Sequence, residues 1–112
     1  VVYDGGNVYG SNWINNGDGD WVSLDWQTGQ AHYQHDWRGK GSILYADERL
    51  YVYEEKDGYM GLIKPDSESF ELVSSFPVTM GSEQHWSHPV ICNGRLYVRH
   101  GDAMMVYDIR EK

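Results

Sequence analysis

Short apolar-rich stretches separated by Gly, Asn and Asp turns recur along the chain, and no window has the period of an amphipathic helix. Three of these stretches align without gaps, and they occupy residues 1–10, 43–52 and 89–98. Each pattern indicates a strand, a two-residue turn and a second strand. Asn93-Gly94 favours a tight hairpin because both residue types tolerate positive φ angles. Gly5-Gly6 is the equivalent turn in the first stretch, and Asp47-Glu48 in the second stretch is a weaker hairpin signal.

A third strand is expected after each hairpin, at residues 21–25, 59–63 and 103–108. Fourth strands fit residues 30–37 and about 70–79, and the third unit has none before the sequence ends. The pattern therefore predicts eleven short strands.

Tyr9, Tyr51 and Tyr97 mark the register of this repeat, with offsets of 42 and 46 residues. A period of about 40–50 residues with four strands in each is typical of a β-propeller. We therefore predict an all-β fold, a partial β-propeller of about three four-stranded antiparallel blades with the last one incomplete. The expected blades cover approximately 1–40, 41–82 and 83–112 of a single domain. A sandwich or an open barrel is the alternative, and the repeat in register favours the propeller.

Composition and charge narrow the possible functions. The formal net charge is −8, and no basic cluster exists that could neutralise phosphates, so nucleic acid and anionic membrane surfaces are not expected partners. No apolar run reaches the roughly 18–20 residues of a membrane span. The chain opens directly on a strand, which suggests a processed or truncated product. Cys92 is the single cysteine, so the chain can form no internal disulfide. We expect Cys92 to be a small buried core residue.

The segment from Asp25 to Tyr33 resembles the signature of pyrroloquinoline-quinone (PQQ) repeats, which has an Asp, two further residues, Thr-Gly and then an aromatic residue. Tyr33 stands where that family usually has Trp. We expect Thr28-Gly29 to form the turn between the third and fourth strands, and Tyr33 to pack between neighbouring blades. Residues 41–56 and 85–102 also resemble PQQ-like propeller proteins of bacteria, whereas the loop at 64–69 departs from the signature.

The resemblance implies the C-terminal part of a larger, periplasmic or otherwise extracytoplasmic propeller. Some relatives carry alcohol-dehydrogenase-like names, and many serve as scaffolds or assembly factors. The expected function is a non-catalytic scaffold or a module that binds a protein or small-molecule ligand. The alternative is a fragment of a quinoprotein-type oxidoreductase, similar to PQQ-dependent alcohol or sugar dehydrogenases. PQQ and calcium are possible cofactors by resemblance only. We also expect the chain to self-associate through the open edges of its blades.

Loops and strand ends carry the candidate ligand-binding residues, because the strands of a propeller are committed to packing. These candidates are Trp13, His85, Trp86, His88 and His100. A zinc site at His85, His88 and His100 is the alternative interpretation, with Asp102 as a possible fourth ligand. His85 and His88 are three residues apart, and in a strand this spacing turns their rings to opposite faces. We therefore assign no metal site.

Two other polar groups favour structural roles. Asn16, Asp18 and Asp20 have the alternate spacing of a calcium loop, but Trp21 stands at the position that requires Gly and Gln27 at that of the bidentate Glu. A polar hairpin tip is the better interpretation.

His32 and His35 are expected to be solvated edge residues. The sequence has no Gly-x-Ser-x-Gly elbow, P-loop or dinucleotide fingerprint, so we assign no catalytic residue and leave open whether the parent protein is an enzyme.

Overall fold

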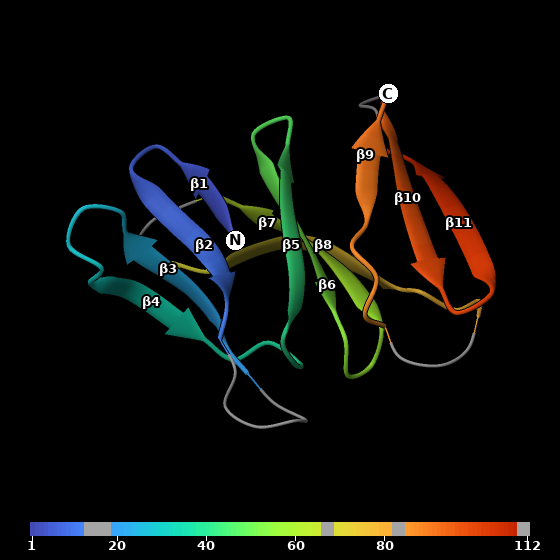
Figure 1. Ribbon diagram of the computed structural model, residues 1–112, viewed down its shortest axis with the longest axis horizontal. Coiled ribbons are helices and arrows are strands. Elements are labelled where there is room, and N and C mark those ends of the chain that lie inside the picture. Colours follow the sequence, from blue (N-terminus) through green and yellow to red (C-terminus); the bar gives the residue numbers. More distant parts are fainter. Residues whose placement is uncertain (13–18, 66–68, 82–84, 110–112) are drawn as a thin grey trace.

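The computed structural model describes residues 1–12, 19–65, 69–81 and 85–109, and these residues form eleven strands in three antiparallel sheets that lie side by side (Figure 1). Blade 1 contains β1 (Val2–Asp4), β2 (Asn7–Ser11), β3 (Trp21–Asp25) and β4 (Ala31–His35). Blade 2 contains β5 (Gly41–Ala46), β6 (Arg49–Glu54), β7 (Tyr59–Lys64) and β8 (Glu71–Pro77). Blade 3 contains β9 (Val90–Cys92), β10 (Arg95–His100) and β11 (Ala103–Asp108).

Every sheet is a meander in which each strand pairs with its neighbour in sequence. The all-β prediction is confirmed, and the sheets are consistent with blades of a partial propeller. The fourth strands are shorter than expected, at residues 31–35 and 71–77. Within the described part of the chain, no helix is long and apolar enough to cross a membrane.

The three hairpins turn as their sequences predict. Both residues of each turn have positive φ, including the two that are not glycine in Asp47-Glu48, at 50° and 60°. Asn93-Gly94 has values of 53° and 72°. Turns of this kind match the right-handed twist of the strands that they join, so the tight hairpins set the same twist in all three blades.

Blades 1 and 2 share one register strand for strand. Tyr9 pairs with Ser23, and Ser23 pairs with Tyr33. In blade 2, Tyr51 pairs with Leu62, and Leu62 pairs with Ser74. A register shift follows at the same place in both sheets, after Ser23 and after Leu62. Ser74 of blade 2 therefore occupies the position that Tyr33 occupies in blade 1.

Two separate apolar cores hold the blades together. The core between blades 1 and 2 contains buried side chains from both sheets, namely Tyr9, Trp21, Ile43, Leu50, Val52 and Ile63. Tyr33 packs against this core and makes an edge-to-face contact with Phe70, with 6.3 Å between ring centroids. Since Phe70 belongs to blade 2, the prediction that Tyr33 packs between neighbouring blades is confirmed.

The core between blades 2 and 3 is built in the same way. Its buried side chains are Tyr51, Tyr53, Met60, Val78, Leu96, Val98 and Met105. Phe76 of β8 and Tyr107 of β11 pack against it with their ring centroids 4.8 Å apart. Blade 2 consequently contributes to both cores.

The turn after β3 forms at Thr28-Gly29, as the resemblance implies. The Asp25 carboxylate accepts hydrogen bonds from the backbone N–H groups of Gln27 (2.8 Å) and Thr28 (3.1 Å). Gly29 has a φ of 74°, and its N–H donates to the Asp25 carbonyl oxygen. The N–H groups of Thr28 and then Gln27 stabilise the charged carboxylate and lower the pKa of Asp25.

The expectation that Cys92 is buried is wrong, because its side chain is exposed. In β9 the residue that packs against a core is Ile91, and side chains alternate between the two faces of a strand. Val90 and Cys92 therefore both point to the opposite face, where both are exposed.

Candidate functional site

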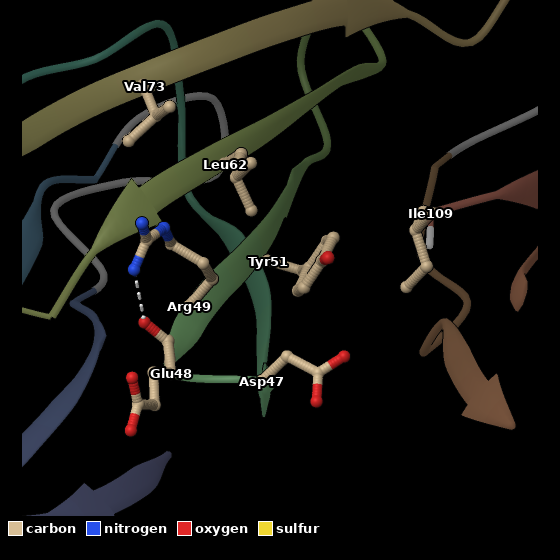
Figure 2. A pocket seen from close by; sticks show the side chains of 7 residues that line it. All are labelled: Asp47, Glu48, Arg49, Tyr51, Leu62, Val73 and Ile109. Atoms are coloured by element: carbon tan, nitrogen blue, oxygen red, sulfur yellow. Dashed lines mark hydrogen bonds between the residues drawn. The ribbon is translucent and has the colours of Figure 1, made fainter. Parts of the chain in front are cut away.

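A groove of about 870 Å³ lies between blades 2 and 3 (Figure 2). Its lining residues are Asp47, Glu48, Arg49, Tyr51, Leu62, Val73 and Ile109. A second, largely apolar cavity of about 170 Å³, here called the hollow, is lined by Tyr51, Met60, Leu62, Ser74, Phe76 and Ile109. Because Tyr51, Leu62 and Ile109 line both, the hollow and the groove are adjacent.

The hollow lies where blade 2 has a small side chain, Ser74, and blade 1 has a large one, Tyr33. The corresponding cavity between blades 1 and 2 measures only about 10 Å³, and both Tyr33 and Phe70 line it. Ser74 replaces the tyrosine in the next interface, and a hydroxymethyl group cannot fill the space of a phenol ring. Ser74 is exposed, so the hollow is an open depression between the two blades.

Charged groups gather at the mouth of the groove, on the hairpin tip between β5 and β6. Asp47 and Glu48 carry carboxylates, and the guanidinium of Arg49 donates a hydrogen bond of 2.9 Å to the Glu48 carbonyl oxygen (Figure 2). Tyr51 lies deeper and is buried. Burial, and then the nearby charge of Asp47, raise the pKa of Tyr51, so its hydroxyl stays neutral.

The groups that line the groove and the hollow are of kinds that bind a ligand. Carboxylates, a guanidinium and a neutral hydroxyl surround an apolar floor, which is the usual composition of a site that orients a bound molecule.

The five candidate ligand-binding residues from the sequence do not lie together in the structure. Trp13 lies outside the described residues. Trp86 and His88 line a shared cavity of about 290 Å³ together with residues of β2 and β5. Trp86 is 68% exposed. These two residues therefore lie at a surface to which β2, β5 and the segment before β9 contribute, together with Val1 and Glu55.

His85 and His100 belong to a different place, beside the core between blades 2 and 3. Their rings stack with centroids 3.5 Å apart, and the Tyr53 hydroxyl hydrogen-bonds His85 Nδ1. His100 is buried, and its Nδ1–H donates to the Met80 carbonyl oxygen over 2.8 Å. Burial raises the pKa of Tyr53 to about 12. Burial, and then the neighbouring His100, lower the pKa of His85.

Across the described ranges, no group of three or more His, Cys, Asp or Glu side chains is placed to hold a metal ion. In the calcium-like segment, Asn16 and Asp18 lie outside those ranges, and the Asp20 carboxylate accepts a hydrogen bond of 2.7 Å from the Gln34 amide. His32 lies 3.8 Å from the Asp25 carboxylate, and His35 stacks on Phe70 of blade 2. Both histidines are exposed, and His35 also contacts the neighbouring blade.

One buried charge escaped the sequence analysis. Glu54 is fully buried, and its carboxylate accepts hydrogen bonds from three backbone N–H groups, those of Asp57 (2.7 Å), Lys56 (3.0 Å) and Tyr59 (3.2 Å). These bonds close the loop between β6 and β7. Aligning the repeats provides the missing signal, because the third residue after each marker tyrosine is polar: Asn12, Glu54 and His100. Asn12 caps its own loop by accepting a hydrogen bond of 2.8 Å from the Asp20 N–H.

No model of a known protein family matches this chain, and no curated protein matches it significantly. Membership of a PQQ-like family therefore stays a prediction from the sequence, based above all on the segment from Asp25 to Tyr33.

Proposed function

We propose that the chain is a non-catalytic binding module that holds its ligand between blades 2 and 3. The observation that supports this proposal is the substitution of Ser74 for the interblade tyrosine of blade 1, which leaves a hollow of about 170 Å³ in an otherwise packed interface. An aromatic or branched apolar group of the ligand would occupy the hollow. Its polar part would lie in the wider groove.

The charge at the groove mouth favours a ligand with a cationic or neutral polar group. Two carboxylates, of Asp47 and Glu48, stand against the single guanidinium of Arg49, and the chain as a whole carries a net charge of −8. Complementary potentials of this kind mainly select the partner and accelerate its encounter.

The resemblance of residues 25–33 supports a wider setting for this module. We propose that it is part of a larger PQQ-like propeller protein of bacteria, in the periplasm. The oxidoreductase alternative requires convergent Arg, Trp and acidic groups, whereas Trp21 and Trp37 lie in the core between blades 1 and 2. Tryptophans that seal neighbouring blades support a scaffold or binding role over a cofactor site.

The proposal can be tested with 4-methylphenol, which has the shape of a tyrosine side chain. In titrations followed by ¹H–¹⁵N NMR, we expect saturable shifts at Tyr51, Leu62 and Ile109. Ser74→Tyr should abolish these shifts because its own ring fills the hollow. The matched control is Ser75→Tyr, since Ser75 pairs with Gly61 and points to the other face of β8; it should bind as the wild-type chain does.

Two results would overturn the proposal: no saturable shift in the wild-type chain, or equal binding by a folded Ser74→Tyr variant. A parallel titration with PQQ and calcium examines the oxidoreductase alternative, which gains support if PQQ binds with saturation.

A further inference from the structure

The connection between β8 and β9 is fastened to blades 2 and 3 by alternate residues. The Tyr53 hydroxyl of β6 hydrogen-bonds His85 Nδ1, and the Ser87 hydroxyl donates a hydrogen bond to the Arg99 carbonyl oxygen of β10. Pro89, directly before β9, is buried. His85, Ser87 and Pro89 therefore anchor this part of the chain.

The two residues between these anchors form part of an exposed surface. Trp86 and His88 are exposed, and both line the cavity of about 290 Å³ to which β2 and β5 also contribute. Trp86 stands between His85 and Ser87 in the sequence, and His88 follows Ser87. The place of both side chains on this surface therefore depends on the anchors beside them.

The ring of His85 fits closely into its place. It stacks on His100 with centroids 3.5 Å apart, and it meets the Tyr53 ring edge to face at 5.4 Å. Gly58 lies against the imidazole, and a Cβ atom at this position would collide with the ring. Closely packed groups of this kind change between discrete arrangements, because packed interfaces do not deform continuously.

The hydrogen bond between Tyr53 and His85 requires a neutral imidazole. Tyr53 is fully buried, and burial raises its pKa to about 12, so its hydroxyl keeps its proton and donates it to Nδ1. A protonated imidazole has an N–H group at both nitrogens and accepts no hydrogen bond. Protonation of His85 therefore leaves a buried hydroxyl without its acceptor.

The other titratable groups around His85 do not offset this loss. They are His100 on β10 and, beyond Tyr53, the side chains of Glu54 and Tyr107. Burial, and then His100, lower the pKa of His85. Within the described ranges, no salt bridge joins His85 to a carboxylate. The closed position of the ring is therefore stable above about pH 6.5, the ordinary pKa of histidine, and is lost as the pH falls below it.

We propose that His85 is a pH-sensitive latch, which holds the connection between β8 and β9 against β6 and β10 at neutral pH and releases residues 85–88 when it is protonated. Release returns the charged imidazole to water and withdraws Trp86 and His88 from the cavity that they line. Histidine is suited to this task because its charge changes near physiological pH. The surface around Trp86 is then assembled at neutral pH and lost in acid.

NMR of the chain between about pH 7.5 and about pH 5 tests the latch. The ring protons of His85 report its protonation, and their nuclear Overhauser contacts with Tyr53 and Gly58 report whether the ring is in place. We expect these contacts to disappear as His85 titrates, with a midpoint below about pH 6.5. Backbone order parameters of residues 85–88 should fall over the same pH range, from about 0.85 to below about 0.6.

The cavity gives a second readout. Ser42 and Ile43 of β5 line it together with Trp86. Their amide resonances should therefore shift with the midpoint of His85. Resonances that do not move would refute the link between the latch and the cavity.

Two variants separate His85 from its neighbour. His85→Phe keeps a ring that takes up no proton, so residues 85–88 should stay ordered throughout the titration. The matched control is His88→Phe, which changes an exposed histidine three residues away. It should lose order with the midpoint of the wild-type chain.

The remaining outcomes are also decisive. Contacts of the His85 ring that persist after it has titrated would overturn the proposal, and so would an equal loss of order in His85→Phe. Order lost in all three blades at the same pH would mean that acid unfolds the chain as a whole and that no latch exists. Should His85→Phe fail to fold, the ring contacts of the wild-type chain still decide, because they need no variant.

Discussion

The buried carboxylate of Glu54 offers the sharpest test of how these blades are held. Glu54→Gln keeps the size of the side chain and removes its charge. A carboxylate presents two acceptor oxygens, whereas an amide presents one oxygen and one NH₂ group. In the native chain one oxygen accepts from Asp57 and Tyr59, and the other accepts from Lys56. Whichever way the amide turns, its NH₂ group faces at least one backbone N–H.

The cost follows from those contacts. A hydrogen bond to a charged group contributes about 1.5–3 kcal/mol, and a buried donor left without a partner costs about 1–3 kcal/mol. Losing one bond and orphaning one donor should therefore lower the free energy of unfolding by about 3 kcal/mol. For a domain of this size, that corresponds to a fall in melting temperature of about 12 °C or more.

Urea unfolding followed by tryptophan fluorescence, with thermal melts beside it, measures this loss. The matched control is Glu55→Gln, which removes an ion pair of 3.0 Å to Lys40 at a partly exposed position. Partly exposed pairs are worth about 1 kcal/mol or less. If Glu54→Gln costs no more than Glu55→Gln, then the carboxylate is not what closes the loop between β6 and β7, and the argument from its three backbone donors is wrong.

Two further predictions concern the candidates from the sequence. Trp86→Ala should change the free energy of unfolding by less than about 0.5 kcal/mol, because the side chain is 68% exposed; a larger loss in urea unfolding would make Trp86 a packing residue. From about pH 6.5, the ordinary pKa of histidine, up to the alkaline range in which tyrosines ionise, stability should be constant with pH. It should fall below about pH 6.5, because the lowered pKa of His85 lets the unfolded chain take up a proton first. Urea titrations of His85→Phe, which keeps a ring, should show a weaker fall, and an unchanged fall would contradict this account.

The strands and turns could be predicted from the sequence because their signals are local. Asn93-Gly94 specifies a hairpin by its own φ preferences, and the aligned copies extended that prediction even to Asp47-Glu48. The interblade position of Tyr33 followed from the resemblance.

Features that depend on the partner across an interface were harder to predict. Cys92 looks apolar in a strand of apolar residues, yet Ile91 takes the buried face and Cys92 the exposed one. The hollow at Ser74 depends on a register shift that moves the fourth strand by one residue relative to the third. Glu54 looks like one of many acidic surface residues, and only its place in the repeat distinguishes it from Glu55.

The two cores have a consequence for how the chain holds together. In the described part of the chain, blade 1 packs against one of these cores, blade 3 packs against the other, and blade 2 contributes to both. In a repeat protein each unit is stabilised largely by its interfaces with its neighbours. A perturbation in β5–β8 therefore weakens two interfaces at once, whereas one in β1–β4 or β9–β11 acts first on a single core.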